Sequence, residues 1–292
     1  MIKEALKQNT LVGPSLTKAS GWLQTWRNKF KQWRFYYKNR EVLRPNKLLK
    51  NSAPGKRCFI LATGPSINKM DLKKLEGEFC ISVSNFFLHP DFNVIKPEYH
   101  IFTASHSPIS YEQYKAWFED AEKHMPEGQK VFIGLTDKVV VDKYRLFKKQ
   151  RVYYYLTGTK EPSENMTIDL AKQLLLIQTS PHTALYIALY MGAKNLCLVG
   201  ADHDWILHYG ETRHFYDEKK SALTQANYNE WNKDFEFVLQ SQVNLWRIYK
   251  KLKRYCDKRG ASIVNCTPGS LLDVFPKKKL EDVLMNTNND RS

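Results

Sequence analysis

Short apolar runs alternate with longer helical stretches along most of the chain. The runs predict strands at about 57–63, 79–84, 99–103, 130–135, 151–156, 195–199 and 261–266. Helical periodicity predicts helices near 111–124, 139–149, 164–176, 181–191 and 227–258. Because apolar strands alternate with helices, the pattern predicts an α/β fold with a mostly parallel sheet covered by helices on both faces.

The N-terminal segment has a different pattern. Aromatic residues recur at steps of three or four, on one stripe of a helix, at Trp22, Trp26, Phe30, Trp33 and Tyr37. Cations follow one position later, at Arg27, Lys31, Arg34 and Lys38. Such a helix suits a membrane surface through residues 22–44, and it equally suits packing on the protein's own core or on a second subunit of a homo-oligomer. Single-stranded nucleic acid is disfavoured, since no RRM, KH or OB signature follows.

Charge and composition set the domain boundaries. The 292 residues carry a formal charge of +15, with 42% hydrophobic and 26% charged residues, typical of a globular protein. Residues 1–50 form a basic aromatic arm, residues 51–285 a single α/β catalytic domain, and residues 286–292 a polar tail. Without a membrane-spanning run or a secretory signal, the expected location is the cytoplasm, or the inner face of the plasma membrane if the arm binds lipid.

The loop after the first strand is the first candidate site. In a parallel sheet, ligands bind beyond the carboxyl ends of the strands. Gly64, Pro65, Ser66 and Asn68 form a turn and a helix start that either cradles a phosphate or only caps a helix. The loop is neither a Walker motif nor GxGxxG. Asn85, after the second strand, either reads a base or sugar edge or caps a turn.

The segment 179–216 is richer in candidate chemistry. Thr179 and Ser180 precede an apolar helix as good start signals. Four of the eight histidines fall between His182 and His214, and a histidine of near-neutral pKa suits a general base; the alternative is hydrogen bonding in a surface loop.

Two carboxylates in this segment match a metal-binding spacing. Asp202 and Asp204 fit the DxD pattern that holds Mg²⁺ on a nucleotide, although a hydrogen bond to Asp202 from a ribose or from backbone amides is favoured. After the last strand, Thr267 and Ser270 either contact a ligand or cap the following helix.

These motifs occur in an order that resembles the bacterial sialyltransferase-like group. The motifs are GPSIN, SN, TSPHTALYIALYMGAKNLCLVGAD and NCTPGSLL, spanning roughly residues 56–275. The group joins glycosyltransferase family 42 to the domain of unknown function 115, which includes a hydroxymethylpterin diphosphokinase. The resemblance implies a Rossmann-like variant of the GT-A fold that binds a CMP-linked sugar without metal.

The resemblance also implies roles for individual residues. Gly64, Pro65, Ser66, Asn68, Asn85, Thr179, Ser180, Asp202, His203, Thr267 and Ser270 are expected to bind the nucleotide sugar. His214 is expected to be the base, with His208 as its rival, and Tyr209 or Tyr216 to assist phosphate departure. Ile177 and Gln178, and not an arginine, stand directly before Thr179, so a carboxylate clamp of the sialyltransferase kind is not expected.

The expected function is transfer of a sugar, such as a nonulosonic acid from a CMP-activated donor, to a surface-glycan or lipid-linked acceptor. The mechanism is expected to be metal-independent and inverting, without a cofactor. The alternative is a pterin diphosphokinase-like enzyme that uses ATP and Mg²⁺ held by Asp202 and Asp204.

Overall fold

The computed structural model describes residues 30–31, 33–105, 109–208, 214–217 and 235–285. The chain divides into two compact units, Met1–Val42 and Leu43–Ser292. The second unit therefore begins before the domain boundary expected at residue 51. Leu43, Asn46 and Leu49, the last two within the 3₁₀ helix η2 (Arg44–Leu49), are buried in it.

The first unit is helical from residue 33 onwards, as the aromatic pattern predicts. Phe30, Trp33 and Tyr37 stack in sequence, with ring centroids 6.0 and 5.4 Å apart. Their exposed fractions are 60%, 57% and 51%. Trp22, Trp26 and Arg27 lie outside the described residues. The described part of the stripe is thus a continuous, exposed aromatic surface.

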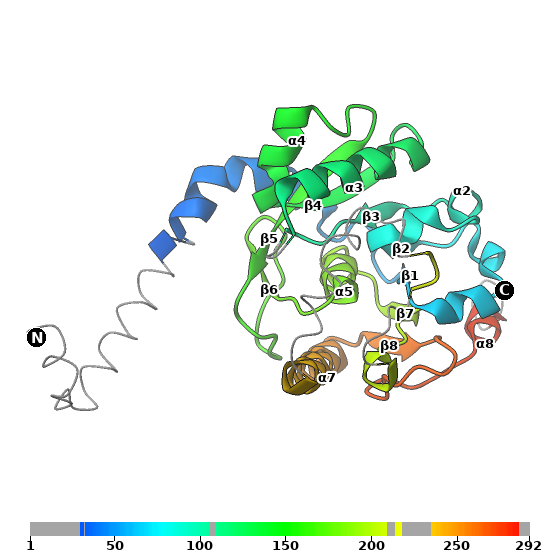
Figure 1. The fold of residues 1–292 in the computed structure, drawn as a ribbon. Coiled ribbons are helices and arrows are strands. Elements are labelled where there is room, and N and C mark those ends of the chain that lie inside the picture. Colours follow the sequence, from blue (N-terminus) through cyan, green and yellow to red (C-terminus); the bar gives the residue numbers. More distant parts are fainter. Residues whose placement is uncertain (1–29, 32, 106–108, 209–213, 218–234, 286–292) are drawn as a thin grey trace, which may run out of the picture. The chain divides into compact units, whose positions relative to one another are not determined.

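The second unit is built on an eight-stranded sheet in the order β6-β5-β4-β3-β2-β1-β7-β8, with every neighbouring pair parallel (Figure 1). The strands are β1 Arg57–Leu61, β2 Cys80–Val83, β3 Tyr99–Ile101, β4 Lys130–Gly134, β5 Arg151–Gly158, β6 Gln173–Leu176, β7 Asn195–Val199 and β8 Ser262–Asn265. Strand order reverses between β1 and β7, and ligands of doubly wound sheets bind at such a reversal.

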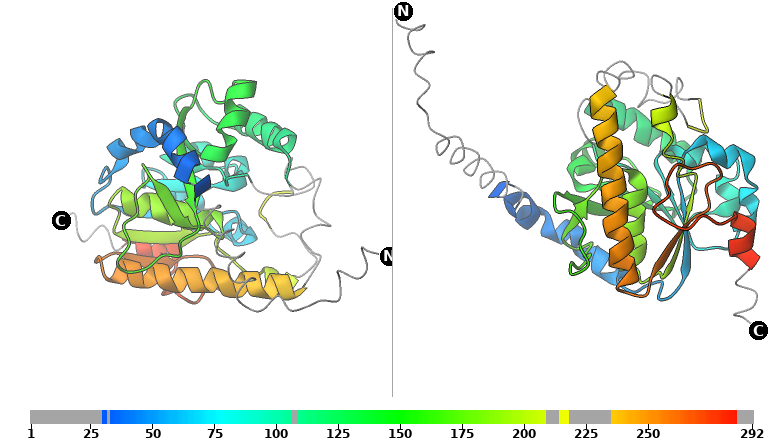
Figure 2. Two further views of the ribbon diagram at one scale, coloured as in Figure 1. Left: turned by 90° about the vertical axis from the view of Figure 1, so that its left-hand side faces the viewer. Right: turned by 90° about the horizontal axis from the view of Figure 1, so that it is seen from below.

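Helices cover both faces of the sheet, and each face has its own hydrophobic core. One face packs against α5 (Ser180–Tyr190) and α7 (Phe235–Asp257). The other packs against α2 (Phe92–Ile95), α3 (Tyr111–His124), α4 (Lys138–Tyr144) and α8 (Leu280–Met285). Figure 2 shows α7 and α8 on opposite sides of the sheet. The predicted α/β class is confirmed.

The connections also contain short 3₁₀ helices that the periodicity does not predict. They are η3 Pro65–Lys69, η4 Leu72–Leu75, η5 Ser84–Leu88, η6 Leu135–Asp137 and η7 Trp205–His208. η5 directly follows strand β2, and three residues, 62–64, separate η3 from strand β1, so the chain turns sharply where these strands end.

The helix predicted at 164–176 is wrong. Residues 173–176 form strand β6, and Leu174 and Leu175 are buried against the sheet. A short run such as QLLL satisfies helix and strand equally, and pairing with β5 decides in favour of the strand. Asn46 reinforces this arrangement by donating to the carbonyls of Tyr154 and Leu170.

Two other helices differ from their predicted limits. Helix α4 stops at Tyr144 because Arg145 takes a left-handed conformation with φ 53°. The first residues of the helix predicted at 227–258 lie outside the described residues, and α7 is described from Phe235. Among the described helices, none has both the length and the apolar character needed to cross a bilayer.

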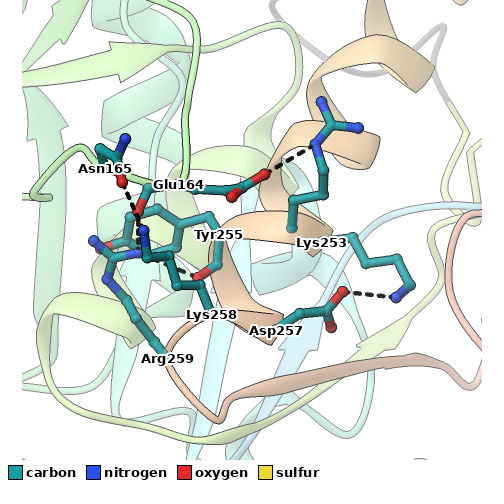
Figure 3. A network of polar contacts seen from close by, with 8 residues as sticks. Glu164, Asn165, Lys253, Tyr255, Asp257, Lys258 and Arg259 are labelled. Atoms are coloured by element: carbon teal, nitrogen blue, oxygen red, sulfur yellow. Dashed lines mark hydrogen bonds and ion pairs between the residues drawn. The ribbon is translucent and has the colours of Figure 1, made fainter.

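The C-terminal end of α7 is tied to the segment between β5 and β6 (Figure 3). Arg259 donates to the carbonyls of Glu164 and Met166, each at 2.7 Å, and its guanidinium lies 3.7 Å above the centre of the Tyr255 ring. Lys258 donates to Asn165 at 2.7 Å. These contacts fix the C-terminal end of α7. Residues nearer its N-terminal end contact His203, which follows strand β7 at the carboxyl edge of the sheet.

Candidate functional site

A pocket lies at the carboxyl edge of the sheet, where strand order reverses. It takes residues from the loops after β1, β2 and β7 and from the start of α5, and its empty volume of about 560 Å³ includes open solvent at the mouth. The lining residues are Ala62, Thr63, Gly64, Val83, Ser84, Thr179, Ser180, Pro181, Gly200, Ala201, Asp202, His203, Asp204, Trp205 and His214. Segments far apart in the sequence therefore converge on one polar site, as expected for parallel strands.

A buried carboxylate joins the loops after β1 and β7. Asp202 is 8% exposed; its Oδ1 accepts from the Ser66 amide at 3.1 Å and its Oδ2 accepts from the Ser66 hydroxyl at 2.7 Å. The Gly64 amide donates to the Gly200 carbonyl at 2.9 Å. Asp202 thus orders the loop that Ser66 opens, which matches the expectation of backbone amides donating to it.

Gly64 is required by space and not by conformation. Its φ is −65°, which any residue adopts. A Cβ at this position would lie 1.9 Å from Asp202 Oδ2 and 2.6 Å from the Gly200 carbonyl oxygen. The close approach that the glycine permits is therefore that of a protein carboxylate.

Three pocket residues have a left-handed backbone. The φ angles are 56° at Ser84, 72° at Gly200 and 51° at His203. Non-glycine residues in this region cost on the order of 1–3 kcal/mol each, and such strain concentrates at functional sites. Ser84 and His203 are therefore held in place by their surroundings.

A buried histidine holds Ser84. His100 Nε2 lies 2.9 Å from the Ser84 carbonyl oxygen, which can only accept, so Nε2 carries the proton. Nδ1 then accepts from the Ser82 hydroxyl at 2.8 Å. Burial lowers the pKa of His100 to about 3, so the ring is neutral near pH 7.

His214 reaches the pocket through its neighbour. The Phe215 amide donates to the Thr63 carbonyl at 3.0 Å, and the Phe215 ring packs against Phe86 and His89, with centroids 6.1 and 5.3 Å away. His214 is exposed and lines the pocket. This anchoring holds the segment that carries His214 against the loop after β1.

The other expected catalytic residues, His208 and the two tyrosines, differ from His214 in their position. His208 Nε2 lies 3.6 Å from Asp204 Oδ2, and His208 is not among the lining residues. Tyr216 stacks on the His214 ring at 5.0 Å between centroids. Tyr209 lies outside the described residues. Of the two histidines named as base, the pocket includes His214.

Several expected binding residues lie behind the pocket. Asn85 is 2% exposed and its Oδ1 accepts from the Trp117 indole, so it supports the loop after β2. Thr267 Oγ1 accepts from the Ala201 amide at 3.0 Å, and the Ser270 hydroxyl donates to the Ala201 carbonyl at 2.7 Å. These three residues shape the loops that line the pocket.

Pro65 and Asn68 belong to η3 and are not among the lining residues, and Asn68 is exposed. Thr179 and Ser180 do line it, and the Ser180 hydroxyl lies 2.5 Å from that of Thr103. The α5 start therefore contributes to the pocket as expected.

The sequence does not single out Thr63, Ser84 or Trp205, which line the pocket. For Ser84 the available signal is its position directly after a fully buried strand, next to the expected Asn85. Thr103 is missed as well, although it follows β3 at the same edge.

Comparisons with known proteins bear on the family and the fold. A family model described as "6-hydroxymethylpterin diphosphokinase MptE-like" matches residues 34–206. This match confirms the resemblance to the group that the motif order indicates. A search of curated proteins finds no match.

Two solved structures are similar to the chain, each at 15% sequence identity. One is the sialyltransferase CstII from Campylobacter jejuni with a substrate analogue, CMP-3FNeuAc; its TM-score is 0.45, covering 76% of this chain and 86% of that chain. The other is the sialyltransferase CST-II with a trisaccharide acceptor and CMP; its TM-score is 0.44, covering 76% and 85%.

Proposed function

The chain belongs to the MptE-like family, and from that premise we propose that it is a transferase that holds an activated nucleotide in the pocket and passes a sugar to a hydroxyl acceptor. One observation carries the proposal: loops after three neighbouring strands and the start of α5 form one polar pocket at the reversal of strand order. The strained residues Ser84 and His203 lie in the same pocket.

The proposed chemistry is one displacement with a single base. His214 takes the proton of the acceptor hydroxyl while that oxygen bonds to the anomeric carbon of the donor sugar. The bond between that carbon and the phosphate oxygen breaks, and the nucleotide leaves with the electron pair. Tyr216 stacks on the His214 ring, and we assign its hydroxyl to assist the departing phosphate. A single in-line attack inverts the anomeric configuration.

The donor and acceptor follow from the resemblance. A CMP-linked nonulosonic acid is the favoured donor, and a surface glycan or lipid-linked glycan is the favoured acceptor. Because no arginine stands directly before Thr179, a clamp of the sialyltransferase kind for a donor carboxylate is not expected. The proposal therefore also includes donor sugars without a carboxylate, and donor sugars whose carboxylate is bound by other residues.

The second candidate is Mg²⁺-dependent diphosphate transfer from ATP, which the name of the matching family model favours. Its metal would need Asp202 and Asp204. Both oxygens of Asp202 accept from Ser66, and Asp204 lies beside His208 at 3.6 Å. These two carboxylates do not fit a divalent site as they stand, so sugar transfer is the preferred function.

A ligand screen separates the candidates. The melting temperature of the full chain is measured with CMP, UDP, GDP and ATP, each with Mg²⁺ and with EDTA. Sugar transfer predicts stabilisation by CMP or UDP that survives EDTA, whereas the diphosphokinase predicts stabilisation by ATP that requires Mg²⁺. If none of the four nucleotides stabilises the protein, the nucleotide pocket is wrong.

The chemistry is tested on the base. His214→Ala is expected to bind the nucleotide as the wild type does, since the side chain is exposed and Phe215 still anchors the segment. Transfer is expected to fall about 10²–10⁴-fold, the usual contribution of a general base. Undiminished transfer would exclude His214 from this role.

We also propose that the N-terminal arm binds an anionic lipid surface on the cytoplasmic side of the membrane. Exposed Lys31, Arg34 and Lys38 flank the exposed aromatic stripe, and each cation near an anionic surface contributes about 1 kcal/mol. This placement brings the enzyme to a lipid-linked acceptor. If the arm instead joins two copies of the chain, its removal changes the molar mass in solution and not lipid binding.

A further inference from the structure

A cluster of buried polar side chains lies behind the pocket, and the proposed chemistry uses none of them as base or nucleophile. It consists of His203 on the loop after β7, Tyr249 on α7 and His182 on α5. His203 is 5% exposed and lines the pocket, whereas Tyr249 and His182 are fully buried.

One face of α7 holds His203. Tyr249 Oη lies 2.9 Å from His203 Nε2, and Gln242 Nε2 donates to the His203 carbonyl at 2.9 Å. The Trp246 ring lies between them along the helix, with its centroid 6.1 Å from that of His203. These contacts, spaced at one and two turns, stabilise the left-handed backbone of His203.

The hydrogen bond between Tyr249 and His203 has a preferred direction. Among the described residues, His203 is the one hydrogen-bond partner of the Tyr249 hydroxyl. If Nε2 donated to Oη, the phenolic proton would be buried without an acceptor, which costs about 1–3 kcal/mol. The hydroxyl therefore donates to Nε2, and the ring proton of neutral His203 sits on Nδ1.

His182 packs edge to face on the Tyr249 ring. The Gln178 amide donates to His182 Nδ1 at 3.3 Å, so Nε2 carries the proton. This Nε2 is buried without a hydrogen-bond partner among the described atoms, and its ring meets that of Tyr249 at 67° with centroids 4.2 Å apart. Edge-to-face contacts between rings include N–H···π interactions of this kind.

The charge state of His203 suits a donor and not a base. Burial lowers the pKa of His203 to about 4, so the imidazole is neutral near pH 7. The neutral ring accepts the hydrogen bond of the Tyr249 hydroxyl at Nε2 and keeps one N–H at Nδ1. Among the described residues, no hydrogen-bond partner of Nδ1 is seen.

We propose that Tyr249 is a positioning residue that fixes His203 as the Nδ1–H tautomer, so that His203 offers the pocket a neutral N–H donor for a phosphate oxygen of the ligand. The identity of that oxygen rests on the proposed function; the tautomer does not. A neutral donor binds the phosphate without competing with His214 for the acceptor proton.

The tautomer is tested by nitrogen NMR on the full chain labelled with ¹⁵N-histidine, with His203→Gln to assign the signal. Protonated and unprotonated ring nitrogens are well separated in such spectra. The expected result is protonated Nδ1 and unprotonated Nε2 in the wild type, and a shift towards Nε2–H in Tyr249→Phe, which keeps the ring and removes the hydroxyl. A wild-type His203 protonated at Nε2, or the same tautomer in both proteins, would overturn the proposal.

Binding is tested with CMP as the probe. Tyr249→Phe is expected to weaken CMP binding about tenfold, as expected for a misdirected hydrogen bond of about 1.4 kcal/mol. The matched control is Tyr255→Phe, on the same helix and in the same core, whose hydroxyl contacts the backbone of Ile168; it is expected to bind within twofold of the wild type.

Equal weakening by both variants would show a general effect of α7 and overturn the positioning role. If the wild type binds no nucleotide, the proposed function fails, and the NMR result alone decides the role of Tyr249.

Discussion

Lowering the pH from 7 to 5 is expected to remove about 6 kcal/mol from the free energy of unfolding, through three buried histidines. Burial lowers the pKa of His100 to about 3 and that of His203 to about 4. Burial, and secondly the neighbouring His203, holds the pKa of His182 well below its usual value. All three are neutral in the folded protein throughout this pH range.

The sign and size follow from proton linkage. In the unfolded chain these histidines titrate near their ordinary pKa of 6.5. Below that pH the unfolded state binds protons that the folded state does not. The free energy of unfolding is therefore highest above pH 6.5 and decreases as the pH is lowered. At pH 5, about 1.5 units lower, each histidine costs about 2 kcal/mol at about 1.36 kcal/mol per unit.

The assay is urea unfolding followed by tryptophan fluorescence at several pH values between 7.5 and 5. The slope of the unfolding free energy against pH gives the protons taken up, and about three are expected near pH 5. His89, whose pKa burial also lowers, acts in the same direction. Glu161 and Glu281 have lowered pKa values and act in a more acidic range.

A matched pair of variants isolates the effect. His182→Gln is expected to reduce the proton uptake by about one, whatever its stability at pH 7. Val139→Ala, at an exposed position of α4 without a titratable group, is expected to leave the uptake unchanged. An unfolding free energy that is flat from pH 7 to 5, or equal slopes for both variants and the wild type, would refute the reasoning.

Three further predictions concern the loops, α7 and the arm. Gly64→Ala forces the Asp202 carboxylate away from Ser66, so it should lower the free energy of unfolding in urea by about 3 kcal/mol and abolish nucleotide binding. An unchanged urea midpoint would contradict this prediction. Arg259→Lys keeps the charge but loses the fork to two carbonyls, and should lower stability by about 1–2 kcal/mol while binding persists. In liposome flotation, Trp33→Ala should weaken binding to vesicles containing anionic lipid, whereas Phe35→Ala, outside the stacked stripe, should not; equal flotation of the two variants would remove the lipid proposal.

The sequence predicts the sheet and the edge that carries the pocket. Strands β1 and β7 are apolar and end at a glycine-containing loop, so their position and the placement of Gly64 and Asp202 follow from the pattern. Strand β6 does not follow, because its four residues fit a helix equally and only its pairing with β5 decides.

The contacts that build the site could not be predicted from local sequence patterns. Ser66 and Asp202 are 136 positions apart, and no spacing rule connects them. The sequence marks Asn85 as a polar group after β2, but the sharp turn into η5 buries it and presents Ser84 to the pocket instead. Likewise, the sequence predicts Tyr249 only as a core residue of an amphipathic helix, and the structure is needed to show that its hydroxyl contacts His203.

Stability and ligand binding depend on the same neutral histidines, and this affects how the base can be identified. Protonation of His100 removes the acceptor for Ser82 and disturbs Ser84, and protonation of His203 removes the acceptor for Tyr249. Acid therefore damages the pocket by a route that does not involve His214. A fall of activity at low pH supports His214 as the base only where unfolding curves show an intact fold and CMP binding is unchanged. If kcat falls only where the free energy of unfolding also falls, the buried histidines cause the acid sensitivity. In that case the pocket loses its hydrogen bonds before the reaction can begin.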